Sequence, residues 1–529
     1  MIALMAACVA QAQNARPTGA LISHVVETRV EFNTSDSFLG DLYAEAVKVS
    51  KTNEKDFSGR PVLIEGGGYN GIWIETQPMG GEMNARRNMT TAFNNTLLFM
   101  EHQLPNGRYP GLIRYRGGKM LPVYSHTQGY SFPFHALNLY YWNKKRDDAY
   151  LRRLYDSMEK FDDYLWRYRD SDGDGCLETW CVWDTGEDNS NRFAGTKLNH
   201  GGWSGEAPPD DPVFPVESMD VMAYSYDTRA TLARLSVMLG NGKEREWQAK
   251  AATVRDKLRE YLWDEKRGAC FDRDRDNKVM PALIHNNLRV MYHGMFTPEM
   301  AGRFVREHLL NPEEFWTPFP LPSIAINDPA YRVGSNDWSG EPMGLTYQRV
   351  IRALENYGFN AELVLIGEKL IAATGRDKFF TQQYDPRTSA ASPVKGRNDY
   401  GPTLLAALEY MTRFYGVNVE LDELHWGALG REGHTTSYTQ HWAGDAYTIE
   451  SKDGSTVASI NGREIFRTDC GVRVDTDWRG TVLRIVNLRP DPVRVRFQAN
   501  GRETTLNLKR NEAFAFSSAD SAVASRRDF

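Results

Sequence analysis

The segment of this sequence with the most chemical content runs from Asp170 to Phe193 and reads DSDGDGCLETWCVWDTGEDNSNRF. Its seven acidic residues are interrupted by Gly, Trp and Cys, so they do not form the solvated face of a helix. The segment follows an amphipathic helical pattern and is expected to be a long loop. Carboxylates gathered in one loop can bind a cation or transfer protons, and the two halves of this segment suggest one role each.

The first half indicates a cation site. Asp170, Asp172 and Asp174 alternate and are followed by Gly175, as in the first half of an EF-hand loop. Glu178 comes too early to be the bidentate ligand that closes such a loop. We predict structural calcium bound by the three aspartates, and no cofactor required for catalysis. The alternative is an Asp/Gly turn whose carboxylates cap the loop.

The second half, WDTGEDNSNRF from Trp183 to Phe193, carries a family resemblance. It resembles the W-[ED]-[ST]-G-x-D-N-[SA]-x-R-[FYW] motif of the inverting (α/α)6-barrel glycosidases. This group includes processing α-glucosidase (glycoside hydrolase family 63), trehalase and bacterial mannosylglycerate hydrolase. Four more segments are similar to family segments in the expected order, so the resemblance spans roughly residues 60–415. These are QLPNGRYPG from Gln103, VESMD from Val216, NDWSGEPM from Asn336 and FTQQYDP from Phe380.

The resemblance implies a glycosidase that removes the terminal sugar of a small α-glycoside or oligosaccharide with inversion. One carboxylic acid protonates the leaving oxygen, and a second carboxylate, roughly 6.5–9.5 Å away, activates water on the other face. Asp188 is implied as the general acid, and burial beside Trp183 would keep it protonated. Trp183 would wall the sugar subsite, and Arg192 would hold the loop or a substrate hydroxyl. The alternative for Asp188 is a carboxylate that caps the loop.

The general base is where the sequence departs from the family. Gln382 stands at the position of the family's glutamate, and an amide cannot accept a proton. Ser339 stands where the family has arginine. We predict Glu341 as the base and Asp399 as the second candidate; the alternative for Glu341 is a carboxylate that favours a helix start. A local alignment shifted by a few residues, or a chain that binds sugar without hydrolysing it, would also explain Gln382.

Further residues are expected to line the subsite because aromatic rings in Gly/Pro-rich loops can stack on sugars. They are Tyr69, Asn70, Trp73, Glu75, His126, Gln128, Trp203, Trp316 and Trp338, joined by Gln382, Tyr384 and Asp399. The departures at Ser339 and Gln382 argue against the family's usual glucose and leave a rhamnosidase-like or arabinosidase-like activity open. A non-catalytic carbohydrate-binding protein is the rival from another class. The acidic motif argues against a polysaccharide lyase, which would need a Tyr or His base.

The elements that must position these residues follow from hydrophobic periodicity. Amphipathic helical patterns dominate residues 35–415, with short turns alternating with long loops at 104–129, 169–216 and 310–339. The helices expected from these patterns include Glu82–Gln103 and Pro281–Tyr292. This predicts a mainly α protein whose (α/α)6 barrel spans 61–417 after an N-terminal segment, 13–60. Short alternating strands then predict an antiparallel β-sandwich at 418–518 and a polar tail at 519–529.

Composition excludes several classes of function. The net charge is −6 and no basic run is present, so nucleic acid is not expected as a partner. No run approaches the roughly 18 apolar residues that span a bilayer. Residues 1–12 resemble a signal peptide ending in Ala-Gln-Ala, which predicts a periplasmic or secreted protein. Cys176 and Cys181 are close enough in sequence to pair there, whereas a zinc site is not expected. The sequence leaves the oligomeric state open.

Overall fold

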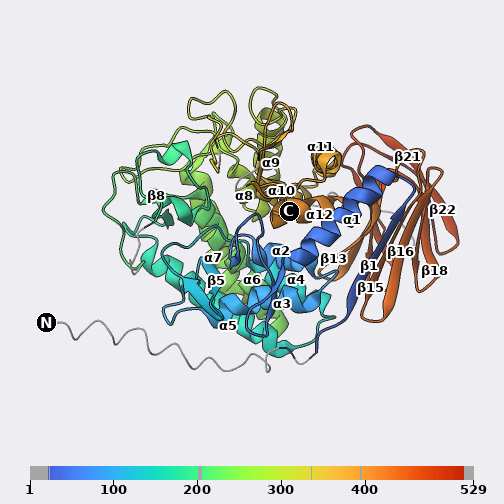
Figure 1. Cartoon of the computed structure of the whole chain (residues 1–529), viewed down its shortest axis with the longest axis horizontal. Coiled ribbons are helices and arrows are strands. Elements are labelled where there is room, and N and C mark those ends of the chain that lie inside the picture. Colours follow the sequence, from blue (N-terminus) through green and yellow to red (C-terminus); the bar gives the residue numbers. More distant parts are fainter. Residues whose placement is uncertain (1–21, 23, 200–204, 335, 393–395, 517–529) are drawn as a thin grey trace.

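The computed structural model describes residues 22, 24–199, 205–334, 336–392 and 396–516. Figure 1 shows a large helical part beside a layered β part formed by the C-terminal residues. The predicted signal segment 1–12, Trp203 and the tail 519–529 lie outside the described residues. No described helix is both long and apolar enough to cross a membrane.

Twelve α-helices occur among the described residues, six of which surround the centre of the helical part. Helices α2, α4, α6, α8, α10 and α12 contact one another in this order, and α12 returns to contact α2. Helices α3, α5, α7 and α11 pack against this ring, and α1 covers α11 and α12. The helices are α1 (Ser37–Thr52), α2 (Gln77–Asn84), α3 (Met89–Glu101), α4 (Pro133–Trp142), α5 (Asp148–Tyr168), α6 (Met219–Leu239), α7 (Glu244–Tyr261), α8 (Asn287–Tyr292), α9 (Pro298–Phe304), α10 (Gly344–Glu355), α11 (Asn360–Asp377) and α12 (Gly401–Tyr415).

Local sequence explains where several of these helices begin and which are central. The side chains of Asp36, Asn88 and Ser218 accept hydrogen bonds from free backbone N–H groups at the starts of α1, α3 and α6. Every residue of α2, α8 and α12 except Arg413 is buried, whereas α7 buries one narrow stripe. A helix that is apolar or fully packed on all sides belongs inside the domain, and an amphipathic helix belongs at its surface.

The β part consists of two antiparallel sheets that face each other in Figure 1. The seven-stranded sheet has the order β1-β15-β16-β17-β18-β21-β22, and the five-stranded sheet the order β13-β14-β19-β20-β23. Their strands are β1 (Thr28–Thr34), β13 (Val417–Glu420), β14 (Glu423–Ala428), β15 (Thr436–Trp442), β16 (Asp445–Lys452), β17 (Ser455–Ile460), β18 (Arg463–Asp469), β19 (Val472–Asp477), β20 (Val482–Asn487), β21 (Val493–Ala499), β22 (Arg502–Leu508) and β23 (Ala513–Ala515).

Strand β1 ties the start of the chain to this C-terminal part. It pairs antiparallel with β15 over its whole length, so the sandwich includes a strand from the N-terminal segment. The helical part and the sandwich also meet at Lys144, whose ammonium lies 3.2 Å from the ring centre of Trp442. Both contacts join residues far apart in sequence. A division of the chain at residue 418 places the two partners of each contact in different domains.

Short strands organise the loops of the helical part. They are β2 (Glu54–Asp56), β3 (Pro61–Leu63), β4 (Gly71–Trp73), β5 (Leu112–Arg116), β6 (Lys119–Val123), β7 (Glu178–Thr179), β8 (Val216–Glu217), β9 (Trp263–Asp264), β10 (Ala269–Cys270), β11 (Gln383–Tyr384) and β12 (Ala391–Ser392). The pairs β7–β8 and β11–β12 fasten the long loops that carry the predicted site residues.

Three local predictions differ from the structure. A single helix predicted over Glu82–Gln103 is two helices, α2 and α3, separated by residues 85–88. A helix predicted from Pro281 begins only at Asn287. Cys176 and Cys181 do not pair: both are buried free thiols, and burial raises their pKa values well above the ordinary range.

Candidate active site

The loop that carries Asp188 connects α5 to α6 and is held by ion pairs beneath it. Arg169, at the end of α5, contacts the Asp184 carboxylate at 2.6 Å, and both side chains are almost fully buried. Burial opposes the charge on Asp184, but Arg169 outweighs it and holds the pKa of this carboxyl well below its usual range. Asp184 also accepts the Thr127 backbone N–H, which joins two long loops. A buried, paired carboxylate fixes the backbone that presents Asp188.

Arg192 supports the same loop from inside. Its guanidinium contacts Glu187 and Asp272, each at 2.5 Å, and its side chain is 2% exposed. Burial opposes the charge on Glu187, but Arg192 and the neighbouring His285 hold the pKa of Glu187 far below normal. Of the two roles predicted for Arg192, the structure supports holding the loop. Contact with a substrate hydroxyl is not supported, because both arms of the guanidinium are already paired.

Asp188 is partly exposed and belongs to a continuous chain of hydrogen bonds. Its Oδ2 accepts from Asn336 Nδ2 at 3.1 Å, and Asn336 Oδ1 accepts from Gln382 Nε2 at 3.1 Å. Gln382 Oε1 in turn accepts from the Tyr69 hydroxyl at 2.9 Å. The structure therefore brings together Asp188, Gln382 and Tyr69 as the sequence predicts. A single amide, that of Asn336, fills the space between the acid and the glutamine.

The backbone fixes the position of this acid. The Trp338 N–H donates to the Asp188 carbonyl at 3.1 Å, and the Asn189 side chain donates to the Asn336 carbonyl at 2.8 Å. Asn336 and Asn189 both have positive φ, which asparagine tolerates better than most residues. These contacts clamp the two loops that meet at Asp188, so its position depends on residues about 148 apart in sequence.

Tyr69 packs against Tyr400, whose hydroxyl donates to a buried carboxylate that the sequence did not single out, Glu65. Burial raises the pKa of the Tyr69 phenol, and the negative charges of Glu65 and Asp188 raise it further. Glu65 follows strand β3, and its Oε1 accepts a hydrogen bond from the Tyr400 hydroxyl at 3.0 Å. The rings of Tyr69 and Tyr400 meet edge to face at 6.3 Å. Glu65 is thus linked to Tyr69 through the Tyr400 side chain.

The two carboxylates predicted as general base are held in other ways. Glu341 is 3% exposed. Burial raises its pKa to about 7, against a lowering hydrogen bond from Ser392. Among the described residues, Glu341 shares no hydrogen bond with Asp188, Asn336 or Gln382. Asp399 is paired with Arg397 at 2.6 Å, and this hydrogen bond holds its pKa below normal.

Of the predicted aromatic residues, only some are available to a substrate. Trp183, Trp73 and Tyr69 are partly exposed; Trp183 meets His126 edge-on at 5.4 Å, and Trp73 meets Tyr69 at 5.6 Å. Trp338 is 2% exposed, and its ring packs on His285, so it supports the loop and does not wall a subsite. Tyr384 is likewise buried, and its hydroxyl donates to the Phe379 carbonyl. The prediction that these two rings contact substrate is corrected by their burial.

Glu75 and Gln128, which were also expected near the subsite, are hydrogen-bonded to each other. Gln128 Nε2 donates to Glu75 Oε2 at 2.8 Å, and Arg349 contacts Glu75 Oε1 at 2.6 Å. Ser339, at the family's arginine position, is fully buried, and its hydroxyl accepts the Asn191 backbone N–H at 2.6 Å. A short buried hydroxyl cannot replace an arginine that reaches substrate.

The predicted calcium ligands gather as expected and are joined by two more carboxylates. Oxygen atoms of Asp170, Asp172 and Asp174 lie within 4.8 Å of one another, as do those of Asp172, Glu178 and Glu217. The pairing of β7 with β8 places Glu178 opposite Glu217. Glu217 Oε2 is buried without a hydrogen-bond partner. Burial raises the pKa of Glu217 to about 8, opposed by a hydrogen bond from the Cys176 thiol and aided by the neighbouring carboxylates. An unpartnered oxygen among acids fits a bound cation.

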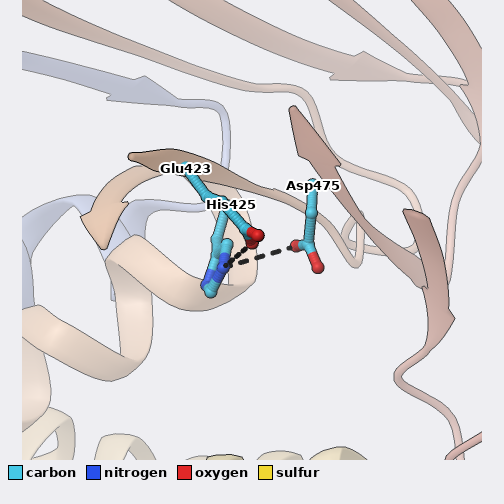
Figure 2. Close-up of side chains that lie close together, drawn as sticks. All are labelled: Glu423, His425 and Asp475. Carbon is cyan, nitrogen blue, oxygen red and sulfur yellow. Dashed lines mark hydrogen bonds and ion pairs between the residues drawn. The ribbon is translucent and has the colours of Figure 1, made fainter. Parts of the chain in front are cut away.

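A second group with metal-binding residue types lies in the sandwich. Figure 2 shows His425 facing the carboxylates of Glu423 and Asp475. Its Nε2 lies 3.4 Å and 3.8 Å from their oxygen atoms. Arg484 contacts both carboxylates, and Arg473 contacts Asp475 at 2.8 Å. Two arginines already supply the positive charge, so this group is an ion-pair network and not a metal site.

Sequence reasoning missed Glu65, Asn336 and Glu217 as members of these sites. Asn336 and Glu217 lie within segments that are similar to the family, NDWSGEPM and VESMD. The sequence therefore marked their positions but gave no indication of their roles. The signal for Glu65 was weaker: it directly precedes Gly66-Gly67-Gly68, a glycine run that ends at Tyr69. All three glycines have positive φ, and they turn the chain so that the backbone of Tyr69 hydrogen-bonds that of Gly66.

Comparison with known proteins gives the family. Residues 85–403 match the family described as "Mannosylglycerate hydrolase MGH1-like glycoside hydrolase domain". The chain belongs to this glycoside hydrolase family. Within it, the resemblance of the WDTGEDNSNRF segment to family 63 is confirmed, and the protein is a glycosidase. Among curated proteins, no match is found.

Solved structures share the fold of this glycoside hydrolase. The family 63 mannosylglycerate hydrolase of Thermus thermophilus in complex with glucose has 19% identity and a TM-score of 0.58, covering 70% of this chain and 99% of that chain. The neutral trehalase of Saccharomyces cerevisiae has 13% identity and a TM-score of 0.52, covering 67% and 74%. The α-L-rhamnosidase of Dictyoglumus thermophilum has 12% identity and a TM-score of 0.52, covering 82% and 44%. These similarities show the fold alone.

Proposed function

We propose that this glycoside hydrolase removes the terminal sugar of a small α-glycoside or oligosaccharide with inversion, and that Asp188 is its general acid. The observation that carries the proposal is the Asp188–Asn336–Gln382 chain. Two hydrogen bonds and the Asn336 amide separate Asp188 from Gln382, so the two side chains do not touch. Inverting enzymes hold their catalytic groups roughly 6.5–9.5 Å apart, which leaves room for water. Retaining enzymes hold their carboxyl groups only about 5–5.5 Å apart.

The ring of even-numbered helices supports an (α/α)6 barrel as the architecture. Each of the six contacts the next, and the contact between α12 and α2 closes the ring. The long loops after α3, α5 and α9 then converge with the loop before α12 around Asp188. Such a barrel places the site at the end where loops from several helix pairs meet, as expected for functional loops on a rigid scaffold.

Each partly exposed residue of the site has a role in the proposed reaction. Asp188 would donate its proton to the glycosidic oxygen as the bond to the anomeric carbon breaks. The rings of Trp183, Trp73 and Tyr69 would contact the apolar faces of the sugar. Asn336 would exchange its hydrogen bond to Asp188 for one to the substrate. Because Asp188 reaches solvent whereas Glu187 and Gln382 are buried, the scissile bond would lie on the solvent side of Asp188.

Buried Ser339 favours a sugar other than the family's usual glucose. Its hydroxyl is committed to Asn191, so the cationic contact that arginine gives is absent at this described position. This observation keeps a rhamnosidase-like or arabinosidase-like activity as the second candidate. Among solved structures, the α-L-rhamnosidase of Dictyoglumus thermophilum is one with a similar fold.

A substrate panel with stereochemical readout tests the proposal. Purified protein would be offered mannosylglycerate, glucosylglycerate and the 4-nitrophenyl α-glycosides of glucose, mannose, rhamnose and arabinose. Proton NMR in the first minutes would record the anomer released. We expect one sugar to be turned over and its β-anomer to appear first. First appearance of the α-anomer would refute inversion. Binding without turnover of any compound would favour the carbohydrate-binding alternative.

We further propose that the loop after α5 holds a structural Ca²⁺. The residues present fit this ion: Asp170, Asp172 and Asp174 supply alternating carboxylates, and Glu178 and Glu217 complete an all-oxygen donor set. Glu178 lies too early in sequence for an EF-hand, but strand pairing with Glu217 offers a different closure of the loop. The ion would stabilise the loop that leads to Asp188 and take no part in the reaction.

A further inference from the structure

A pocket lined by arginines lies among helices α4, α6, α7 and α10. Its volume is about 380 Å³, which is in the range of small-molecule sites. Four arginines line it: Arg234 on α6, Arg255 and Arg259 on α7, and Arg352 on α10. Asp227 is the one carboxylate among these lining residues, all of which the structure describes. A hollow with this excess of positive charge attracts anions.

Helix α10 separates this pocket from the candidate active site. At the start of the helix, the Gly344 N–H donates to the Gln382 carbonyl at 2.8 Å. Towards its other end, Arg352 and the following Tyr357 line the pocket. The 12 residues of α10 rise roughly 18 Å along the helix axis. The pocket is therefore a second site, distinct from the loops that meet at the catalytic acid.

The carboxylate in the pocket already has a partner. His293 Nδ1 lies 2.7 Å from Asp227 Oδ2. Burial lowers the pKa of His293 and outweighs the opposing effect of Asp227, so the imidazole is neutral at pH 7 and donates an N–H to the carboxylate. Within the described chain, no ion pair joins Asp227 to an arginine of the pocket. The positive charges are therefore not cancelled by this residue.

The two more buried arginines have donors to spare. Nε of Arg259 and Nε of Arg352 are buried and have no hydrogen-bond partner among the described residues. Arg259 donates through Nη2 to the Met295 carbonyl at 2.9 Å. Arg352 stacks on Phe134, with Cζ 3.4 Å from the ring centre, and its Nη1 lies 3.9 Å from Glu420. Buried polar groups are normally paired, and an anion in the pocket would supply the acceptors.

The other two arginines are more exposed and are weakly neutralised. Arg255 contacts the exposed carboxylate of Asp256 at 3.1 Å, and such surface ion pairs contribute little. Arg234 is exposed on α6. Burial lowers the pKa of Arg259, and the charge of Arg255 lowers it further, yet an arginine stays protonated. These cations repel one another, and a bound anion would relieve the repulsion.

The chemistry of the lining favours a phosphate over a single carboxylate. A phosphate ester carries about −1.5 to −2 charges at pH 7 and three acceptor oxygens, enough for several guanidinium groups. The rings of Tyr226 and Tyr357 also line the pocket and offer an apolar surface for the organic part of a ligand. A hollow of about 500 Å³ between α6 and α7 adjoins the pocket, shares Arg234 and Arg255 with it, and gives a ligand access.

We propose that this pocket binds a small phosphate ester, with the phosphate on Arg255, Arg259 and Arg352 and the organic part against Tyr226 and Tyr357. The ligand joins α6, α7 and α10, so binding stabilises the helical part of the protein by mass action. It takes no part in hydrolysis, and its binding does not depend on the function proposed for Asp188.

The test is calorimetric titration of the full-length protein with glycerol 3-phosphate at low ionic strength, with glycerol and citrate as comparison compounds. We expect a Kd below about 1 mM for the phosphate ester and no heat with glycerol. Arg255→Gln and Arg259→Gln should each raise the Kd at least about 10-fold, the effect of one lost charge-assisted hydrogen bond. Arg245→Gln is the matched control, because Arg245 is exposed on the same helix and does not line the pocket.

The other outcomes would overturn the proposal. Wild-type protein that shows no binding at this level has no such site. Binding that survives in both pocket variants lies elsewhere, and equal weakening in Arg245→Gln shows attraction by net charge alone. Citrate that binds more tightly than glycerol 3-phosphate would refute the phosphate assignment. If Arg259→Gln fails to fold because it loses the contact with Met295, Arg255→Gln decides, since its printed-chain partner Asp256 is at the surface.

Discussion

Asp188→Asn is the substitution that tests the acid most directly. Asparagine has the same shape as aspartate, and its carbonyl can still accept the 3.1 Å hydrogen bond from Asn336. The backbone contact from Trp338 to residue 188 does not involve the side chain. Asp188 is partly exposed, so the substitution removes a charge that solvent already reaches. We therefore expect thermal unfolding within about 1 °C of wild type, with the loss confined to catalysis.

The size of the loss should depend on the leaving group. General-acid catalysis contributes about 10²–10⁴-fold, which corresponds to about 3–5 kcal/mol of transition-state stabilisation. An alkyl glycoside such as a glycosylglycerate needs all of this transition-state stabilisation, because its leaving alkoxide is strongly basic. A 4-nitrophenolate leaves without a proton, so the same variant should lose less than about 10-fold on the aryl glycoside.

The assay compares kcat on the two substrates for wild type and Asp188→Asn. Asp56→Asn is the matched control, since Asp56 is an exposed carboxylate on β2 outside the site. A fall of less than 10-fold on the alkyl glycoside would refute the acid role. An equal loss on both substrates would show that Asp188 acts on something other than the leaving oxygen.

Three further predictions concern stability. Removal of calcium with EDTA should lower the melting temperature by several degrees and added Ca²⁺ should restore it, whereas Glu217→Gln should abolish this response; a melting temperature indifferent to both would contradict the site. Arg192→Met should cost about 3–5 kcal/mol of unfolding free energy in urea, because it leaves Glu187 and Asp272 buried without their cation; a loss below 1 kcal/mol would contradict that pairing. Burial opposes the charge on Glu423, but His425 and Arg484 outweigh it and lower its pKa from 4.5 to about 2. The stability it contributes is therefore complete above about pH 4.5 and is lost as the pH falls towards 2. Glu423→Gln should flatten that part of the acid-unfolding curve, and an unchanged slope would refute the assignment.

Much of the helical part was predictable because its signals are local. Amphipathic periodicity and capping residues such as Asp36 and Ser218 depend on neighbours within one or two turns of helix. The break between α2 and α3 was missed because both helices are buried on all sides, so no polar face marked the boundary. Strand β1 could not be assigned to the sandwich from its residues, since its partner β15 follows about 400 residues later.

For the site, the sequence indicated the family, the candidate acid Asp188 and the acidic loop, because each rests on contiguous residues. The motif from Trp183 to Phe193 identifies Asp188, and the Asp170–Asp174 spacing indicates a cation, before any contact is known. Tertiary structure decided which groups face them. It buried Trp338 and Tyr384, committed Arg192 to ion pairs, and set Glu217 against the acidic loop.

The groups that face Asp188 were the least accessible to sequence. Gln382 is far from Asp188 in the chain and is linked to it only through Asn336, whose side chain hydrogen-bonds both. Residue type and spacing can show that the family's base is absent at Gln382. Which carboxylate lies across the gap depends on loops from several helices meeting in space, and this is fixed by packing and not by local sequence.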